Sequence, residues 1–143
     1  RAAVEEALSL LKPPRSVMLP VSAPFHCRLM LPAEEKLAVE LERTIFRDLR
    51  FPVISNVDAK PLRTGEEART SLRRQVSRSV QWAASMDVLR NLDVGTFVEC
   101  GSGKVLSGLL KRIGRGWPVA PVIYNVEDGS SLEKTKASLS AAG

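Results

Sequence analysis

The second half of the chain alternates short apolar runs with longer amphipathic segments. Residues 95–100 and 119–125 are short and apolar, as buried strands are, and helical spacing of apolar residues follows them at 104–113 and 131–142. Strands that alternate with helices are typical of α/β folds with a parallel sheet. We therefore expect an α/β fold, in one compact unit because the chain has no repeats and no low-complexity linker.

The first half predicts further elements of the same kinds. We expect helices over 1–12, 28–48, 64–76 and 80–92, and strands over 17–21 and 51–55. The 28–48 segment carries an apolar stripe of Leu29, Ala33, Leu37, Leu41 and Ile45. Thr64 and Glu67 fit a capping box that opens the 64–76 helix.

The charge balance favours an anionic partner. The 143 residues include 21 Lys and Arg against 16 Asp and Glu, a net charge of +5. Nucleic acid is not expected, because the basic residues are scattered through helices and aromatic residues make up only 5% of the chain. Two alternatives stay open: docking on an acidic carrier protein, and a solvated basic surface without a specific partner.

Cysteine and histidine counts argue against a disulfide framework and against a metal site. Cys27 and Cys100 are two isolated cysteines, and His26 is the single histidine. No stretch approaches the roughly 20 apolar residues that a membrane-spanning helix needs, so we expect a soluble protein that does not contact a membrane.

His26 is the candidate for acid–base chemistry. It lies between an expected strand and an expected helix, and a free imidazole titrates near ~6.5, within reach of cellular pH. The alternative is a histidine that only forms local hydrogen bonds at a helix start. Cys27 is not expected to act as a nucleophile paired with His26, because the side chains of adjacent residues on an extended or turn backbone point apart.

The Gly101-Ser102-Gly103-Lys104 segment follows an expected strand and opens an expected helix. Such a turn can hold phosphate on its free N–H groups, with Lys104 assisting. The fuller Gly-x-x-x-x-Gly-Lys-Ser/Thr loop is absent, so a tight turn that needs small residues is the default interpretation.

Six segments together resemble one known family, the malonyl-CoA:acyl carrier protein transacylases. In chain order they are Pro20 to Met30, Pro52 to Ala59, Arg74 to Val76, Val80 to Trp82, Thr96 to Glu99 and Gly101 to Leu109. The resemblance is collinear from about residue 17 to 113, and it is specific because the separate segments fall in the right order. The chain departs from the usual family pattern at Ser79, Cys100 and Ser102.

The resemblance implies a partial α/β-hydrolase-like acyltransferase domain. Residues 1–22 would be the end of a small ferredoxin-like subdomain, and 23–143 the C-terminal part of the large α/β domain. The family's nucleophile elbow is absent, since the chain has no Gly-x-Ser-x-Gly. The resemblance therefore implies a missing N-terminal half that carries the serine. We also expect a companion segment or chain, because a parallel sheet with half its strands would leave an apolar edge unpaired.

The resemblance also implies a function: an S-malonyltransferase of fatty acid or polyketide biosynthesis that works by a ping-pong route through a malonyl-serine. Malonyl-CoA would be the substrate and the phosphopantetheine thiol of acyl carrier protein the acceptor, with no bound cofactor and no metal. His26 would be the general base, and the Gln75 main-chain carbonyl would orient it. Without the resemblance, Gln75 reads as an ordinary helix-surface residue.

Two further residues are candidates for substrate binding. Phe25 resembles the family's residue that keeps the acyl pocket small enough to prefer malonyl over methylmalonyl, with core packing as its alternative. Asn56 follows an expected strand and would face the site, with a turn-forming role as its alternative. The rival function is a non-catalytic, truncated module that docks an acidic carrier protein. A bacterial origin would place the protein in the cytoplasm, and plastid or mitochondrial locations stay open.

Overall fold

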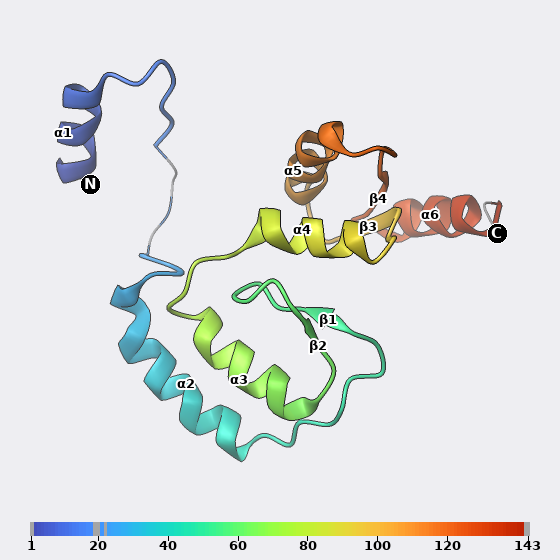
Figure 1. Ribbon diagram of the computed structural model, residues 1–143, viewed down its shortest axis with the longest axis horizontal. Coiled ribbons are helices and arrows are strands. Elements are labelled where there is room, and N and C mark those ends of the chain that lie inside the picture. The colour runs from blue at the N-terminus through green and yellow to red at the C-terminus, as the bar shows by residue number, and fades with distance from the viewer. Residues whose placement is uncertain (1, 19–20, 22, 142–143) are drawn as a thin grey trace.

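The computed structural model describes residues 2–18, 21 and 23–141, and its helices and strands form an α/β arrangement (Figure 1). In chain order the helices and strands are α1 (Ala2–Leu11), η1 (Arg28–Met30), α2 (Leu31–Arg43), β1 (Val53–Ile54), β2 (Pro61–Leu62), α3 (Gly65–Gln75), α4 (Trp82–Asn91), β3 (Thr96–Cys100), α5 (Val105–Ile113), η2 (Gly114–Gly116), β4 (Val122–Val126) and α6 (Gly129–Ala141). The elements labelled η are single turns of 3-10 helix.

Strands β3 and β4 form the parallel pair that the alternating pattern predicts. They are in register from Thr96 opposite Val122 to Cys100 opposite Val126, and α5 makes the crossover between them. α6 then packs against β4. The α/β prediction is confirmed here, because a parallel pair needs a crossover connection and the 104–113 segment supplies it as a helix.

The prediction of a buried strand over 51–55 is wrong. Only Val53 and Ile54 are extended, and they pair antiparallel with β2 in a two-stranded hairpin. The chain turns directly after β1, because the Ser55 hydroxyl oxygen accepts the N–H groups of Val57 and Asp58 at 3.3 and 3.2 Å. A short side chain that bonds its own backbone competes with a longer strand.

The predicted helix over 28–48 is shorter than expected. It begins as η1, continues without a break into α2, and ends at Arg43. Thr44 has an extended backbone, and its hydroxyl donates to the Glu40 carbonyl at 2.7 Å, which closes the last turn. Ile45 therefore lies outside the helix and is 86% exposed, so it does not belong to the apolar stripe.

The capping box that opens α3 is confirmed. The Thr64 hydroxyl accepts the Glu67 N–H at 3.2 Å, and the Glu67 carboxylate accepts the Thr64 N–H at 2.9 Å. Gly65 is needed at the first helical position, since a Cβ there would lie 2.6 Å from the Phe46 carbonyl oxygen. The chain after α2 passes too close to this helix start for any larger residue.

Helix α1 confirms the predicted N-terminal helix, but none of its described residues is buried (Figure 1). The predicted strand over 17–21 is not formed at Val17, Met18 or Val21. Leu19, Pro20 and Ser22 lie outside the described residues. The ferredoxin-like subdomain at 1–22 therefore stays a prediction.

Apolar surface is left uncovered on the parallel pair of β3 and β4. Parallel strands are normally buried on both faces, yet Val122 of β4 is 48% exposed and Val98 of β3 is also exposed. Within the described ranges, the buried hydrophobic residues are Ala38, Met86 and Leu110. Across those same ranges, no helix combines the length and the hydropathy that crossing a bilayer requires.

Candidate active site

The His26 ring is held by a main-chain carbonyl. Its Nδ1 lies 2.9 Å from the carbonyl oxygen of Gln75, a residue 49 positions away in the chain. A carbonyl oxygen can only accept a hydrogen bond, so Nδ1 carries the proton in the neutral ring. Nε2 then keeps its unshared electron pair, and the exposed ring can use it to take a proton.

The backbone at His26 is in the left-handed region, with φ of 57°. Outside glycine this conformation is uncommon, and sparsely populated backbone conformations cost on the order of 1–3 kcal/mol. Two hydrogen bonds of the next residue, Cys27, stabilise this turn. The Cys27 thiol donates to the Pro24 carbonyl at 3.1 Å, and the Met30 N–H donates to the Cys27 carbonyl at 2.9 Å. The ring therefore projects from a tight turn that leads straight into η1.

The Gln75 carbonyl is free to accept because of its place in the helix. Gln75 is the last residue of α3. Carbonyl groups in the last turn of a helix have no partner within the helix, so they bond to whatever lies beyond its end. The structure thus brings together His26 and Gln75, the two residues that the sequence singled out for catalysis.

The two residues singled out for substrate binding are connected to this pair in different ways. Phe25 immediately precedes His26 and is 59% exposed. Asn56 is half-buried in the turn after β1, and its main-chain carbonyl accepts the Gln81 N–H at 2.6 Å. That bond ties the turn to the segment that follows Gln75. Among the described contacts, no hydrogen bond joins either side chain to His26.

Sequence reasoning missed the charged groups on either side of Gln75. The Arg74 guanidinium pairs with the Asp58 carboxylate. The Glu34 carboxylate of α2 accepts a hydrogen bond from the Ser77 hydroxyl and lies 3.8 Å from Arg73 Nε. The two members of each pair are far apart in the sequence and follow no spacing rule, so no sequence pattern predicts these contacts.

The glycine-rich turn at 101–104 does not offer an open phosphate site. The carboxylate of Glu99 already accepts the N–H groups of Leu106 and Ser107 at 3.0 and 2.8 Å, and the Asn125 amide at 2.9 Å. Hydrogen bonds from the Ser107 hydroxyl, from these N–H groups and from Asn125 lower the pKa of Glu99 to about 2. The anion at the start of α5 is thus a side chain of the protein itself, which supports the tight-turn interpretation.

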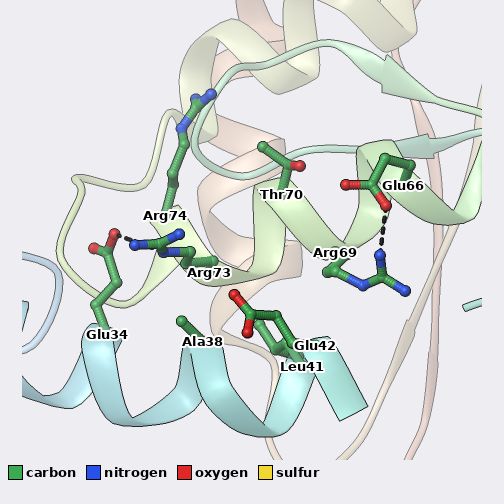
Figure 2. Close-up of a pocket in the computed structure, with 9 residues that line it drawn as sticks. All are labelled: Glu34, Ala38, Leu41, Glu42, Glu66, Arg69, Thr70, Arg73 and Arg74. Atoms are coloured by element: carbon green, nitrogen blue, oxygen red, sulfur yellow. Dashed lines mark hydrogen bonds and ion pairs between the residues drawn. The ribbon is translucent and has the colours of Figure 1, made fainter. Parts of the chain in front are cut away.

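A groove of about 340 Å³ lies between α2 and α3, but it is not the candidate active site (Figure 2). Neither His26 nor Gln75 lines it. Its arginines are already paired, since Arg73 faces Glu34 and Arg69 faces Glu66. A groove whose charges neutralise one another offers little to an anionic substrate.

Another cavity is lined by residues on both sides of Gln75 in the chain. It has a volume of about 580 Å³ and is lined by Val57, Asp58, Arg74, Arg78, Ser79 and Gln81. These residues come from the turn after β1 and from the chain around the end of α3.

Across the described ranges, no three His, Cys, Asp or Glu side chains gather in a way that could hold a metal ion.

Comparisons of sequence identify relatives of this chain. No family model matches it. It is 46% identical over 99 residues to the malonyl CoA-acyl carrier protein transacylase of Escherichia coli (strain K12), and 43% identical over 116 residues to that of Haemophilus influenzae. The matches cover 69% and 79% of this chain. The chain spans about a third of the length of these curated relatives, 32% and 37% respectively.

Comparisons of structure agree with those of sequence. The chain superposes on FabD from Acinetobacter baumannii with a TM-score of 0.86 and 35% identity, over 99% of this chain and 45% of that one. It superposes with a TM-score of 0.85 and 37% identity on a malonyl-transacylase solved in complex with a type II polyketide acyl carrier protein. That match covers 96% of this chain and 44% of its counterpart.

Proposed function

Because the chain is a homologue of the malonyl CoA-acyl carrier protein transacylases, we propose that it is the histidine-bearing, C-terminal part of an S-malonyltransferase. The reaction would serve fatty acid or polyketide biosynthesis. One observation carries the proposal: His26 Nδ1 is bonded to the Gln75 carbonyl at 2.9 Å, which leaves Nε2 as a base. A base held in one tautomer is what a serine nucleophile needs.

In the first half-reaction, His26 Nε2 takes the proton from a serine hydroxyl supplied by the missing N-terminal half. The serine oxygen attacks the thioester carbonyl carbon of malonyl-CoA. The carbon–sulfur bond then breaks, and the imidazolium returns its proton to the departing thiolate of coenzyme A. A malonyl-serine ester remains, and the Gln75 carbonyl stabilises the ring while it is charged.

In the second half-reaction, the phosphopantetheine thiol of an acyl carrier protein gives its proton to His26 Nε2. The thiolate attacks the ester carbonyl, the carbon–oxygen bond breaks, and the serine oxygen recovers the proton. The malonyl group leaves on the carrier. A neutral carbonyl stabilises the imidazolium less than a carboxylate would, so the ring returns its proton readily.

We assign Phe25 and Asn56 to substrate binding. Phe25 immediately precedes His26, and its exposed ring would limit the space for the acyl group, which supports a preference for malonyl over its methylated analogue. Asn56 lies in the turn beside the segment after Gln75 and would contact the thioester. The net charge of +5 supports an acidic partner, and the relative solved with an acyl carrier protein supports a carrier protein in that role.

The uncovered apolar surface supports the proposed missing half. Val98 and Val122 are exposed on a parallel pair that has no further strand among the described residues. A companion segment carrying more strands would cover them. We further propose 1–22 as the end of a ferredoxin-like subdomain and 23–143 as part of the large domain. In a bacterium the reaction would take place in the cytoplasm.

The test is to incubate the complete natural protein with malonyl-CoA and measure its intact mass. We expect the mass of one malonyl group to be added and then lost when acyl carrier protein is supplied. Peptide mapping should place the group on a serine. A protein that binds acyl carrier protein and gains no malonyl mass would instead be the non-catalytic docking module.

A further inference from the structure

We propose that Glu34 is a positioning residue that holds the Gln75 carbonyl against His26, an inference that rests on the function proposed above. Its carboxylate connects the two separate segments that carry this pair. Neither the family resemblance nor the sequence pattern assigns Glu34 any part in the site.

Glu34 holds the chain on both sides of Gln75. One of its carboxylate oxygens accepts the Ser77 hydroxyl, and the other lies 3.8 Å from Arg73 Nε. Figure 2 shows Glu34 reaching from α2 toward Arg73 on α3. The Glu34 side chain is only 12% exposed and Ser77 is 3% exposed, so water competes little for the hydrogen bond between them, whereas the Arg73 side chain is 51% exposed and its ion pair is the weaker contact. Two contacts that flank Gln75 restrict the direction of its carbonyl.

Glu34 is also connected to His26 by a short and mostly helical stretch of chain. It lies eight residues further along: Cys27 has an extended backbone, and after it η1 and the first turn of α2 fill the interval. A helical connection transmits position, since its backbone hydrogen bonds fix each residue relative to the next. Because the Glu34 carboxylate contacts Arg73 and Ser77, it sets the distance between His26 and the end of α3.

Apolar packing between the two helices is too sparse to set that distance. Ala38 is the buried residue of α2, and the buried residues of α3 are Gly65 and Ser71. These buried residues are small, so they bury little apolar surface between the two helices. The hydrogen bond from Ser77 to Glu34 and the ion pair of Glu34 with Arg73, together called the clamp here, hold the end of α3 against α2 where apolar packing is sparse.

A second ion pair acts on Gln75 from another direction. Arg74 pairs with Asp58, which ties the end of α3 to the turn after β1. This pair does not reach the segment that carries His26. Among the described contacts, Glu34 is the side chain that joins the His26 segment to the residues flanking Gln75.

The test reads the tautomer of His26 by nuclear magnetic resonance of the complete natural protein with ¹⁵N-labelled histidine. The His26→Gln variant identifies the signal. In the natural protein, at a pH where the ring is neutral, we expect the proton on Nδ1. In Ser77→Ala the signal should shift toward a mixture of tautomers, because the clamp is lost without any change of charge. Ser79→Ala removes an exposed hydroxyl two residues away and should leave the signal unchanged.

A second pair of variants tests the carboxylate itself. Glu34→Gln and Glu35→Gln each remove one negative charge, but Glu35 is exposed and makes no described contact with α3. Glu34→Gln should shift the tautomer signal and lower kcat roughly tenfold with little change in KM, because a misplaced base weakens the chemical step more than binding. Glu35→Gln should change neither.

The inference is overturned if Ser77→Ala keeps the natural tautomer signal, or if Glu34→Gln behaves like Glu35→Gln. The tautomer signal does not depend on turnover. A clamp-dependent signal in a protein that transfers no malonyl group would therefore support the role of Glu34 and contradict the proposed function.

Discussion

The carbonyl oxygen of Gln75, at the last residue of α3, lies 2.9 Å from Nδ1 of His26, in a turn with left-handed backbone. The two residues are 49 positions apart, so only the folded chain brings them together. This hydrogen bond fixes which ring nitrogen carries a proton, and the first prediction follows directly from it.

His26→Ala in the complete protein should lower malonyl transfer by a factor on the order of a hundred or more, since general bases typically contribute that much. The rate of transfer from malonyl-CoA to acyl carrier protein measures it. Cys27→Ser is the control, because a serine hydroxyl can still donate to the Pro24 carbonyl as the thiol does. Unchanged transfer in the alanine variant would remove His26 from the mechanism.

Phe25→Ser should raise the preference for methylmalonyl-CoA over malonyl-CoA, because removing the ring enlarges the space beside His26. The measurement is the ratio of kcat/KM for the two thioesters, each supplied separately. Phe51→Ser is the matched control, since Phe51 is also exposed and lies in another segment. If the two variants share one substrate ratio, Phe25 does not shape the acyl pocket.

Glu99→Gln should reduce stability in a pH-dependent way. The pKa of Glu99 is lowered from 4.5 to about 2 in the folded protein. A carboxyl whose pKa is lowered by folding stabilises the native state above its unfolded pKa and loses that contribution as pH falls. The variant should therefore be less stable than the natural protein at neutral pH, and the difference should shrink between pH 4.5 and about 2.

Denaturant unfolding at a series of pH values measures this difference. Glu127→Gln serves as the control, because Glu127 is exposed and follows β4 without capping a helix through its carboxylate. A stability difference for Glu99→Gln that stays constant down to the lowest pH would show that its charge is not what holds the turn before α5.

Gly65→Ala should destabilise the fold by about 1–3 kcal/mol, the usual cost of forcing an extra methyl group into a packed site. The added Cβ would meet the Phe46 carbonyl oxygen at 2.6 Å, and a main-chain atom cannot swing aside. Gly108→Ala provides the contrast. No atom lies within 4 Å of that Cβ, so alanine inside α5 should stabilise by about 0.5–1 kcal/mol. Thermal unfolding distinguishes the two, and equal effects would contradict the close approach at Phe46.

The sequence predicted local structure well where short-range chemistry decides it. The capping box at Thr64 and Glu67 formed as expected, because both partners lie within one helical turn. The parallel pair of β3 and β4 followed from two apolar runs joined by a helical segment. The predictions over 28–48 and 51–55 were wrong in length, because Thr44 and Ser55 bond to nearby backbone groups and end regular structure early.

Gln75 could be singled out from the sequence only through the resemblance. Gln75 has no chemical signature, since its contribution is a main-chain carbonyl that every residue possesses. The sequence by itself determined the α/β alternation, the helix starts and His26 as the one available imidazole. Tertiary structure alone decided that the end of α3 meets the His26 turn and that Glu34 joins their segments. Such contacts depend on how separate helices approach one another, which no local pattern encodes.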